Sequence, residues 1–329
     1  MPGTELEGRV VERRPLTGHV GKSGAALERW LLDDGTRLVA KRLTPATDLL
    51  MTLTGDSVGR EYAMWDSGLL RLLPEGVGHA IVDGWREPDG SVVVMRDLRN
   101  EVLGWEDRLD DEQCRWALRR VAAMHQTFRD VPLDPWPEAL TPLPTFLALF
   151  SPDRLRPHLE GASKLPRLAT RGWAHFAEMV PSDVREPVFD LLRRPEPLAE
   201  ALRRRPCTLA HGDLATVNMA VESDVLVLLD WGMPVSAPGA VDVARFVAGC
   251  SSVVDLSREE VLSTYADALG PAYDEAAMHL ALLAGTVWLG WNKALDAAEH
   301  PDPAVRARER EDLDWWVAEA RTTIRSGLL

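Results

Sequence analysis

The sequence predicts an α+β fold with two lobes, a β-rich N-terminal lobe followed by a mainly helical C-terminal lobe. Residues 9–96 hold short β-branched and aliphatic runs that are separated by turn signals such as Asp33-Asp34-Gly35. Residues 258–324 instead carry apolar residues at helical spacing. A chain of 329 residues is also long for one compact unit, so we expect lobes at residues 1–98 and 99–329.

The charge balance of the chain is acidic. It has 37 lysine and arginine residues against 51 aspartate and glutamate residues, and the formal net charge is −14. No basic patch stands out, which argues against nucleic acid and against anionic membrane surfaces as partners. An acidic chain favours a cationic substrate. The composition leaves the oligomeric state open.

Cysteine usage and apolar stretches bear on location. Cys114, Cys207 and Cys250 are odd in number and widely spaced, as expected for a reduced, cytoplasmic protein. The first residues have neither a basic start nor an apolar core, so we expect no signal peptide. The apolar stretch Ala281–Trp291 is too short to span a bilayer.

The N-terminal lobe is expected to begin with strands over residues 10–16, 27–32 and 37–43. The connection between the first two contains Gly21-Lys22-Ser23. It is not a GxxxxGK[ST] phosphate loop, because position 16 is leucine and the following residues continue as a strand. Two interpretations stay open: a glycine-rich turn that covers phosphates through Gly21 and Ser23, or a turn without a ligand.

The remaining elements follow from periodicity and turn signals. A helix is expected over residues 57–73 and a hairpin from strands 80–85 and 91–95. The C-terminal lobe is expected to hold helices over 112–128, 151–205, 258–269, 273–298 and 311–324, with a proline-rich loop over 131–150. His125 lies on the apolar face of the first of these helices, where we expect core packing rather than a ligand.

The most informative stretch runs from Leu209 to Gly232. It predicts a short strand, a loop and a hairpin whose turn is Glu222-Ser223-Asp224. Asn218 would start one strand of this hairpin and Asp230 would end the other, so both lie at the same end, with Asp213 in the loop that feeds it. Hard oxygen ligands of this kind suit Mg²⁺. Asp213 then remains to orient an attacking hydroxyl and take its proton.

The pattern His211-Gly212-Asp213, Asn218 and Asp230-Trp231-Gly232 resembles the aminoglycoside phosphotransferase family, to which the choline kinases are related. The alternative is a buried histidine beside two surface aspartates in an ordinary hairpin. The resemblance implies a protein-kinase-like two-lobed fold and transfer of the γ-phosphate of ATP to a hydroxyl of a small molecule, such as a cationic antibiotic or an amino alcohol. It also implies that Asp213 is the catalytic base and that Asn218 and Asp230 bind Mg²⁺.

The resemblance implies further roles in nucleotide binding. Lys41, in Leu38-Val39-Ala40-Lys41, would contact the phosphates and be held by Glu61; a solvated surface pair is the alternative. Met95 would line the adenine pocket, while the carbonyl of Arg96 and the amide of Leu98 would meet the adenine edge.

Two residues are expected to support the catalytic loop. His211 would brace it from within, and Asp242, at the start of the next helix, would hold it by hydrogen bonds. Ala215-Thr216-Val217 departs from the pattern of many relatives, which affects the acceptor class more than the chemistry.

The nature of the acceptor stays open at this point. A kinase directed at Ser or Thr of a peptide or protein would use the same residues. A catalytically inactive kinase-like binding protein is the third possibility, although every motif residue is present. Trp288 and Trp291 lie three apart on one helix face and resemble the aromatic cation site of choline kinases. Core packing is the alternative for these two indoles.

Overall fold

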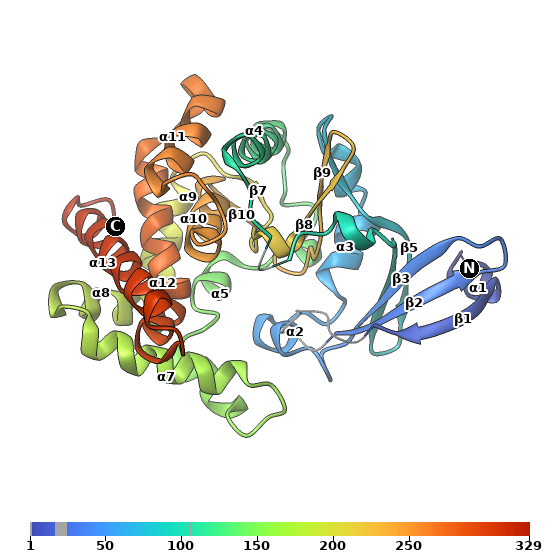
Figure 1. Cartoon of the computed structure of the whole chain (residues 1–329), viewed down its shortest axis with the longest axis horizontal. Coiled ribbons are helices and arrows are strands. Elements are labelled where there is room, and N and C mark those ends of the chain that lie inside the picture. The colour runs from blue at the N-terminus through green and yellow to red at the C-terminus, as the bar shows by residue number, and fades with distance from the viewer. Residues whose placement is uncertain (1, 17–24, 105–106) are drawn as a thin grey trace.

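The structure of the protein is a computed structural model that describes residues 2–16, 25–104 and 107–329. Figure 1 shows two parts, with a strand-rich region at the N-terminal end and a larger helical region at the other end. This arrangement confirms the predicted α+β class. No helix among the described residues combines the length and the apolar character that crossing a membrane requires.

The N-terminal lobe is built on a five-stranded antiparallel sheet in the order β1-β2-β3-β6-β5. The strands are β1 (Val10–Pro15), β2 (Ala26–Leu32), β3 (Arg37–Leu43), β5 (Ile81–Glu87) and β6 (Gly90–Arg96). Alternation along β3 and β6 places Leu38, Ala40, Val92 and Val94 in one apolar cluster with Trp30. The other face of these strands carries Lys41, which is thereby directed away from that cluster.

The helix expected over residues 57–73 is shorter in the structure. Helix α3 (Arg60–Asp66) is followed by Gly68, whose φ of 81° interrupts the helix, and by the 3₁₀ turn η1 (Leu69–Leu72). The N-terminal lobe contains two helices that were not predicted: α1 (Pro2–Gly8) and α2 (Leu49–Thr54). The side chain of Asp48 caps α2 by accepting from the backbone amides of Leu50 and Met51.

The C-terminal lobe surrounds one long buried helix, α12, which packs against α13, α7 and α10. The proline-rich stretch contains a short helix, α5, rather than only loop. Helix α13 begins eight residues earlier than expected, because Asp302 caps it and Pro303 occupies its first position. The helices are α4 (Asp111–Phe128), α5 (Leu143–Leu147), α6 (Pro152–Leu155), α7 (Leu165–Met179), α8 (Ser182–Arg193), α9 (Glu196–Arg203), α10 (Ala240–Cys250), α11 (Arg258–Leu269), α12 (Glu275–Glu299) and α13 (Pro303–Arg325).

Two small sheets accompany the five-stranded sheet, and one of them joins the two parts. Strand β7 (Thr208–Ala210) pairs with β10 (Val235–Ala237), and β8 (Met219–Glu222) forms a hairpin with β9 (Val225–Leu228). Strand β4 (Val77–His79), which the sequence did not predict, lies parallel to β9. Hydrogen bonding therefore ties a segment before residue 98 to the predicted catalytic hairpin. The boundary at residue 98 stays a prediction.

Candidate active site

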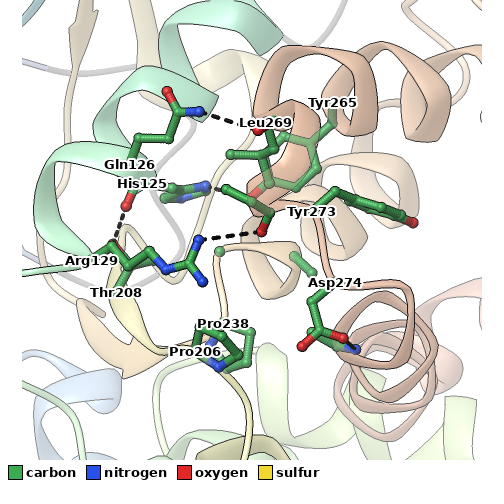
Figure 2. Close-up of a pocket in the computed structure, with 14 residues that line it drawn as sticks. His125, Gln126, Arg129, Pro206, Thr208, Pro238, Tyr265, Leu269, Tyr273 and Asp274 are labelled. Carbon is green, nitrogen blue, oxygen red and sulfur yellow. Dashed lines mark hydrogen bonds between the residues drawn. The ribbon is translucent and has the colours of Figure 1, made fainter.

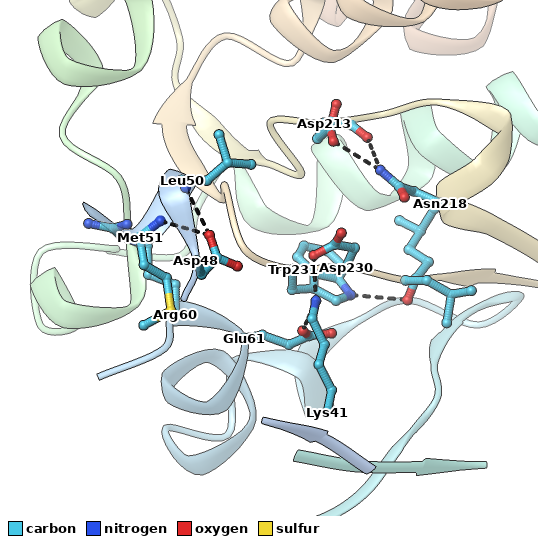
Figure 3. Close-up of polar contacts among 12 residues, drawn as sticks. Lys41, Asp48, Leu50, Met51, Arg60, Glu61, Asp213, Asn218, Asp230 and Trp231 are labelled. Atoms are coloured by element: carbon cyan, nitrogen blue, oxygen red, sulfur yellow. Dashed lines mark hydrogen bonds and ion pairs between the residues drawn. The ribbon is translucent and has the colours of Figure 1, made fainter. Parts of the chain in front are cut away.

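The hairpin β8–β9 brings together the residues that the sequence singled out. Met219 pairs with Leu228, so Asn218, just before β8, and Asp230, just after β9, lie at one end of the hairpin. The extended run expected from residue 217 begins only at Met219, because residues 216–218 form a 3₁₀ turn in which the Asn218 amide donates to the Ala215 carbonyl. In Figure 3, Asn218 faces Asp213 across this turn.

The side chain of Asn218 has a defined orientation. Its Nδ2 donates to the carbonyl oxygen of Asp213 at 2.8 Å and to Oδ2 of the Asp213 side chain at 3.1 Å. The amide oxygen of Asn218 is therefore the atom left to accept or to coordinate. Fixing the amide in this way presents an oxygen on the side where Asp230 lies (Figure 3).

Lys41 lies between two carboxylates. Its Nζ is 2.8 Å from Oε2 of Glu61 and 2.7 Å from Oδ1 of Asp230, and the Lys41 and Glu61 side chains are buried. Burial alone would lower the pKa of Lys41, but the charges of Asp230 and Glu61 raise it above its ordinary value, so the amine stays protonated. Burial raises the pKa of Glu61, an effect that the Lys41 ammonium only partly offsets.

Asp230 combines charge with an unusual backbone conformation. Desolvation acts to raise its pKa, but the Lys41 ammonium outweighs this effect and holds the pKa below its ordinary value. Its φ of 59° lies in the left-handed region, where a residue with a side chain carries strain of about 1–3 kcal/mol. Its side chain is 43% exposed, so the carboxylate remains accessible beside Lys41.

The donor set fits Mg²⁺ in chemistry. Asp230 and Asn218 offer carboxylate and amide oxygens, which a hard cation prefers, with waters and substrate phosphates completing the coordination. No group of three or more His, Cys, Asp or Glu side chains within the described part of the chain could hold a metal by itself.

The buried carboxylate of Asp242 holds the loop that carries Asp213 in place. Asp242, at the start of α10, accepts from the backbone amides of His211 at 2.7 Å and Gly212 at 2.8 Å. It also contacts Nε2 of His125 at 3.1 Å, and Nδ1 of His125 lies 2.9 Å from the hydroxyl of Tyr265. Burial acts to raise the pKa of Asp242, but the bonds from His125 and the loop outweigh it and lower that pKa.

Residues within the catalytic loop also stabilise its conformation. His211 Nδ1 accepts from the Asp213 amide at 3.3 Å, which leaves Nε2 to donate to the Leu229 carbonyl at 2.9 Å. Gly212 has a φ of 81°, and a side chain there would meet the carbonyl oxygen of Met233 at 1.9 Å. Only glycine fits this position. This geometry fits the bracing role predicted for His211 and Asp242.

Of the predicted adenine contacts, Met95 and Arg96 end strand β6 and Leu98 follows it. Met95 is half-buried, and the guanidinium of Arg96 pairs with Glu222 of β8 at 2.9 Å. Among the described residues, no hydrogen bond is donated by the backbone amide of Leu98, and its contact with the adenine edge stays a prediction. Gly21 and Ser23 lie outside the described residues.

Trp288 and Trp291 are buried in the helical lobe, with exposed fractions of 4% and 5%. Trp288 stacks on Phe146 with a centroid distance of 4.9 Å, and Phe150 contacts both indoles. The cation that lies against Trp288 is the chain's own Arg245, whose guanidinium carbon is 5.5 Å from the ring centroid. The arrangement is that of core packing, and binding of a substrate cation to these indoles stays a prediction.

Arg245 is a site residue that sequence reasoning missed. Its Nε donates to Oδ1 of Asp213 at 2.8 Å. The sequence held one signal for it: Arg245 lies three residues after Asp242, so both share the face of α10 that contacts the loop. His125 was correctly predicted to be buried, but its bond to Asp242 was not foreseen.

A separate small pocket of about 50 Å³ lies between α4 and α11 (Figure 2). Its walls include His125, Tyr265, Tyr273, Arg129 and Asp274. Of these residues, His125 and Tyr265 also belong to the hydrogen-bond network of Asp242. Asp213, Lys41 and Asp230 do not line it.

Comparison with known proteins identifies structures of similar fold. Three similar structures are an aminoglycoside phosphotransferase from Alicyclobacillus acidocaldarius (15% identity, 98% of this chain and 96% of that chain, TM-score 0.51), an ethanolamine kinase from Plasmodium vivax (13%, 99% and 85%, 0.54) and a choline kinase from Streptococcus pneumoniae (12%, 96% and 97%, 0.54). At these identities the likeness shows a shared fold, which is the protein-kinase-like fold expected from the sequence. A search of curated proteins finds no match.

The model of one protein family matches residues 84–279, which is more than half of the chain. The matched range contains His211, Asp213, Asn218, Asp230 and Asp242, and thus the whole loop and its support. The chain therefore belongs to the phosphotransferase enzyme family.

Proposed function

We propose that this protein transfers the γ-phosphoryl group of ATP to a hydroxyl group of a small molecule. The observation that carries the proposal is the convergence of three groups beside Asp213: the Lys41 ammonium held by Glu61, the Asp230 carboxylate and the Asn218 amide oxygen. Phosphoryl transfer depends on positioning and on neutralising charge, and these groups supply both.

Each residue has a distinct part in the proposed reaction. Lys41, now paired with Asp230, would contact the nucleotide phosphates while Glu61 keeps its stem in place. Asp230 and Asn218 would hold Mg²⁺, which neutralises phosphate charge when bound. Asp213 would accept a hydrogen bond from the acceptor hydroxyl, orient it toward the phosphorus and take its proton.

The two lobes are proposed to have different roles. Residues 1–98 would bind the nucleotide, with Met95 lining the adenine pocket, the Arg96 carbonyl and Leu98 amide at the adenine edge, and Gly21 and Ser23 near the phosphates. Residues 99–329 would carry the catalytic loop and the acceptor. Similar structures are named for aminoglycosides, ethanolamine and choline, so a cationic antibiotic or an amino alcohol is the first class to test.

The proposal is tested by following ATP consumption with the purified protein, Mg²⁺ and a panel of aminoglycosides, other cationic antibiotics, amino alcohols and sugars. The expected result is consumption that depends on both Mg²⁺ and an acceptor and that yields a phosphate monoester of that acceptor. Phosphate found only on Ser or Thr of added peptides would redirect the proposal to a protein kinase. Failure to bind ATP in the presence of Mg²⁺ would overturn it.

Replacing Lys41 by methionine should raise the KM for ATP, lower turnover, or both, while acceptor affinity stays unchanged. The reason is that Lys41 carries the buried positive charge that is held beside Asp230. Steady-state kinetics with ATP varied at fixed acceptor measures this effect, and Glu61→Gln should produce a milder form of it. Lys164→Met, at an exposed position, is the control. Equal ATP kinetics in wild type and Lys41→Met would remove the assignment.

Replacing Asp230 by asparagine should weaken Mg²⁺-dependent nucleotide binding. Loss of a partner outside the coordination shell typically costs about 10–100-fold in metal affinity or activity, and a direct ligand should cost at least as much. Nucleotide binding by calorimetry at varied Mg²⁺ gives the shift. An Mg²⁺ dependence identical to that of wild type would show that Asp230 does not bind the metal.

A further inference from the structure

Arg245 contacts the carboxylate of Asp213, the group that is proposed to act as the base. It projects from α10, and its side chain is only 10% exposed. Its Nε donates to Oδ1 of Asp213 at 2.8 Å, while Asn218 occupies the other oxygen, Oδ2. The two oxygens of Asp213 therefore face different neighbours.

Those neighbours distinguish two sides of Asp213. Asn218 and Asp230 form the side proposed for the metal and the nucleotide phosphates. Arg245 lies on the other oxygen and against Trp288 of α12, deep in the helical lobe. In the proposed reaction the acceptor hydroxyl lies between Asp213 and the γ-phosphorus, so the rest of the acceptor extends away from the nucleotide. The helical lobe, in which Arg245 binds Oδ1 of Asp213, lies in that direction, and Arg245 is therefore placed to contact the part of the acceptor next to the reacting hydroxyl.

The position of the guanidinium is defined by its surroundings as well as by Asp213. The guanidinium lies over the ring of Trp288, and its central carbon is 5.5 Å from the ring centroid. Gly249, one helical turn further along α10, provides the remaining space: a Cβ there would lie 2.0 Å from Nη1 of Arg245. These contacts hold the Arg245 side chain, which has many possible rotamers, in one conformation.

Most of the hydrogen-bonding capacity of Arg245 is unused. A guanidinium carries five N–H donors and no acceptor, and within the described residues only the Nε–H of Arg245 donates a hydrogen bond. The four N–H groups of Nη1 and Nη2 are left for a ligand. Such donors bind oxygen atoms and repel an ammonium group.

We propose that Arg245 determines acceptor specificity: it selects an acceptor that presents an oxygen atom, and no ammonium group, next to the hydroxyl that reacts. This inference rests on the proposed function and narrows its acceptor class. An aminoglycoside remains possible only at a hydroxyl whose neighbouring substituent is oxygen. A simple 2-amino alcohol such as ethanolamine is excluded.

The test measures binding and does not require turnover. The probes are two matched pairs that differ in one group, glycerol against 2-amino-1,3-propanediol and glucose against glucosamine, with glycerate as the carboxylate member. Each is titrated by ligand-observed NMR into the full chain saturated with Mg²⁺ and a non-hydrolysable ATP analogue. The variants are Arg245→Gln, Arg245→Lys and Gly249→Ala, which displaces Nη1 without removing the charge. Arg205→Gln, which breaks an arginine–carboxylate pair with Asp274 elsewhere, is the matched control.

The expected result is that the oxygen members bind wild type and Arg205→Gln at least about tenfold more tightly than their ammonium partners. This preference should largely disappear in Arg245→Gln, weaken in Gly249→Ala and partly return in Arg245→Lys, with affinity for the ATP analogue unchanged. A stronger signal from glycerate than from glycerol would identify the favoured oxygen as a carboxylate oxygen.

Three results would overturn the inference: equal or tighter binding of the ammonium members, an unchanged preference in Arg245→Gln, or no binding of any oxygen member. These outcomes are distinct from failure of the proposed function. Phosphorylation of a hydroxyl beside an ammonium group would uphold phosphoryl transfer and refute the role of Arg245. Absence of ATP binding would refute the function itself.

Discussion

Replacing Asp213 by asparagine should lower turnover by about 10²–10⁴-fold, the range expected for a positioned general base. Asparagine keeps the size of the side chain and one oxygen, but it cannot take a proton from the acceptor hydroxyl. Nucleotide affinity should change little, since Lys41, Asp230 and Asn218 remain. Single-turnover kinetics, with ATP binding measured separately by calorimetry, tests both parts of the prediction.

The same substitution leaves the guanidinium of Arg245 without its carboxylate, so folding must be checked by thermal melting. Arg245 is nine-tenths buried, and a buried charge that loses its partner destabilises the fold. Asp89→Asn, in the exposed turn between β5 and β6, serves as the control. A folded Asp213→Asn protein that turns over like wild type would show that another group takes the proton.

Replacing Asp242 by alanine should have the largest effect on stability, a loss of about 3–5 kcal/mol in the free energy of unfolding. Asp242 is fully buried and accepts from the His211 and Gly212 amides and from His125, all of which would lose their partner at once. Native domains are stable by only about 5–15 kcal/mol, so a loss of this size is severe. Urea denaturation of wild type and variant gives the difference.

If Asp242→Ala does not fold, Asp242→Asn keeps one oxygen acceptor and provides a milder comparison. The pH dependence adds a check. Because the pKa of Asp242 is lowered in the fold, its charge contributes stability that is fully present above the ordinary value of 3.8. That contribution disappears as the pH falls through the lowered pKa, so the difference between wild type and Asp242→Asn should shrink in acid. A stability loss under about 1 kcal/mol in Asp242→Ala, within the range of a single hydrogen bond, would contradict the supporting role.

The sequence predicted the architecture well where local signals were strong. Strands with β-branched runs and clear turns, such as β3 and β6, fall within two residues of their expected bounds. Helix α11, whose N-cap Ser257 forms a capping box with Glu260, begins and ends where expected. The hairpin placed Asn218 and Asp230 at one end because pairing register is a local property.

What the sequence could not predict depends on contacts between distant segments. Strand β4 has only three residues and exists because β9, about 150 residues later, offers it a parallel partner. In the 3₁₀ turn before β8, the amide of Thr216 donates to Sγ of Cys250 in α10, a contact with a distant segment. His125 and Arg245 gain their roles from Asp242 and Asp213, which lie more than 100 and about 30 residues away in the chain.

The central claim is that Asp213 directs the γ-phosphoryl group of ATP to a hydroxyl of a small molecule. Its most direct test follows ATP labelled at the γ-phosphate, with Mg²⁺ and a mixture of hydroxyl-bearing acceptors, in wild type and Asp213→Asn. A labelled phosphate monoester should form only with Mg²⁺, and its yield should fall by at least about 10²-fold in the variant. Equal product in both proteins, or no binding of ATP by the wild type, would contradict the claim.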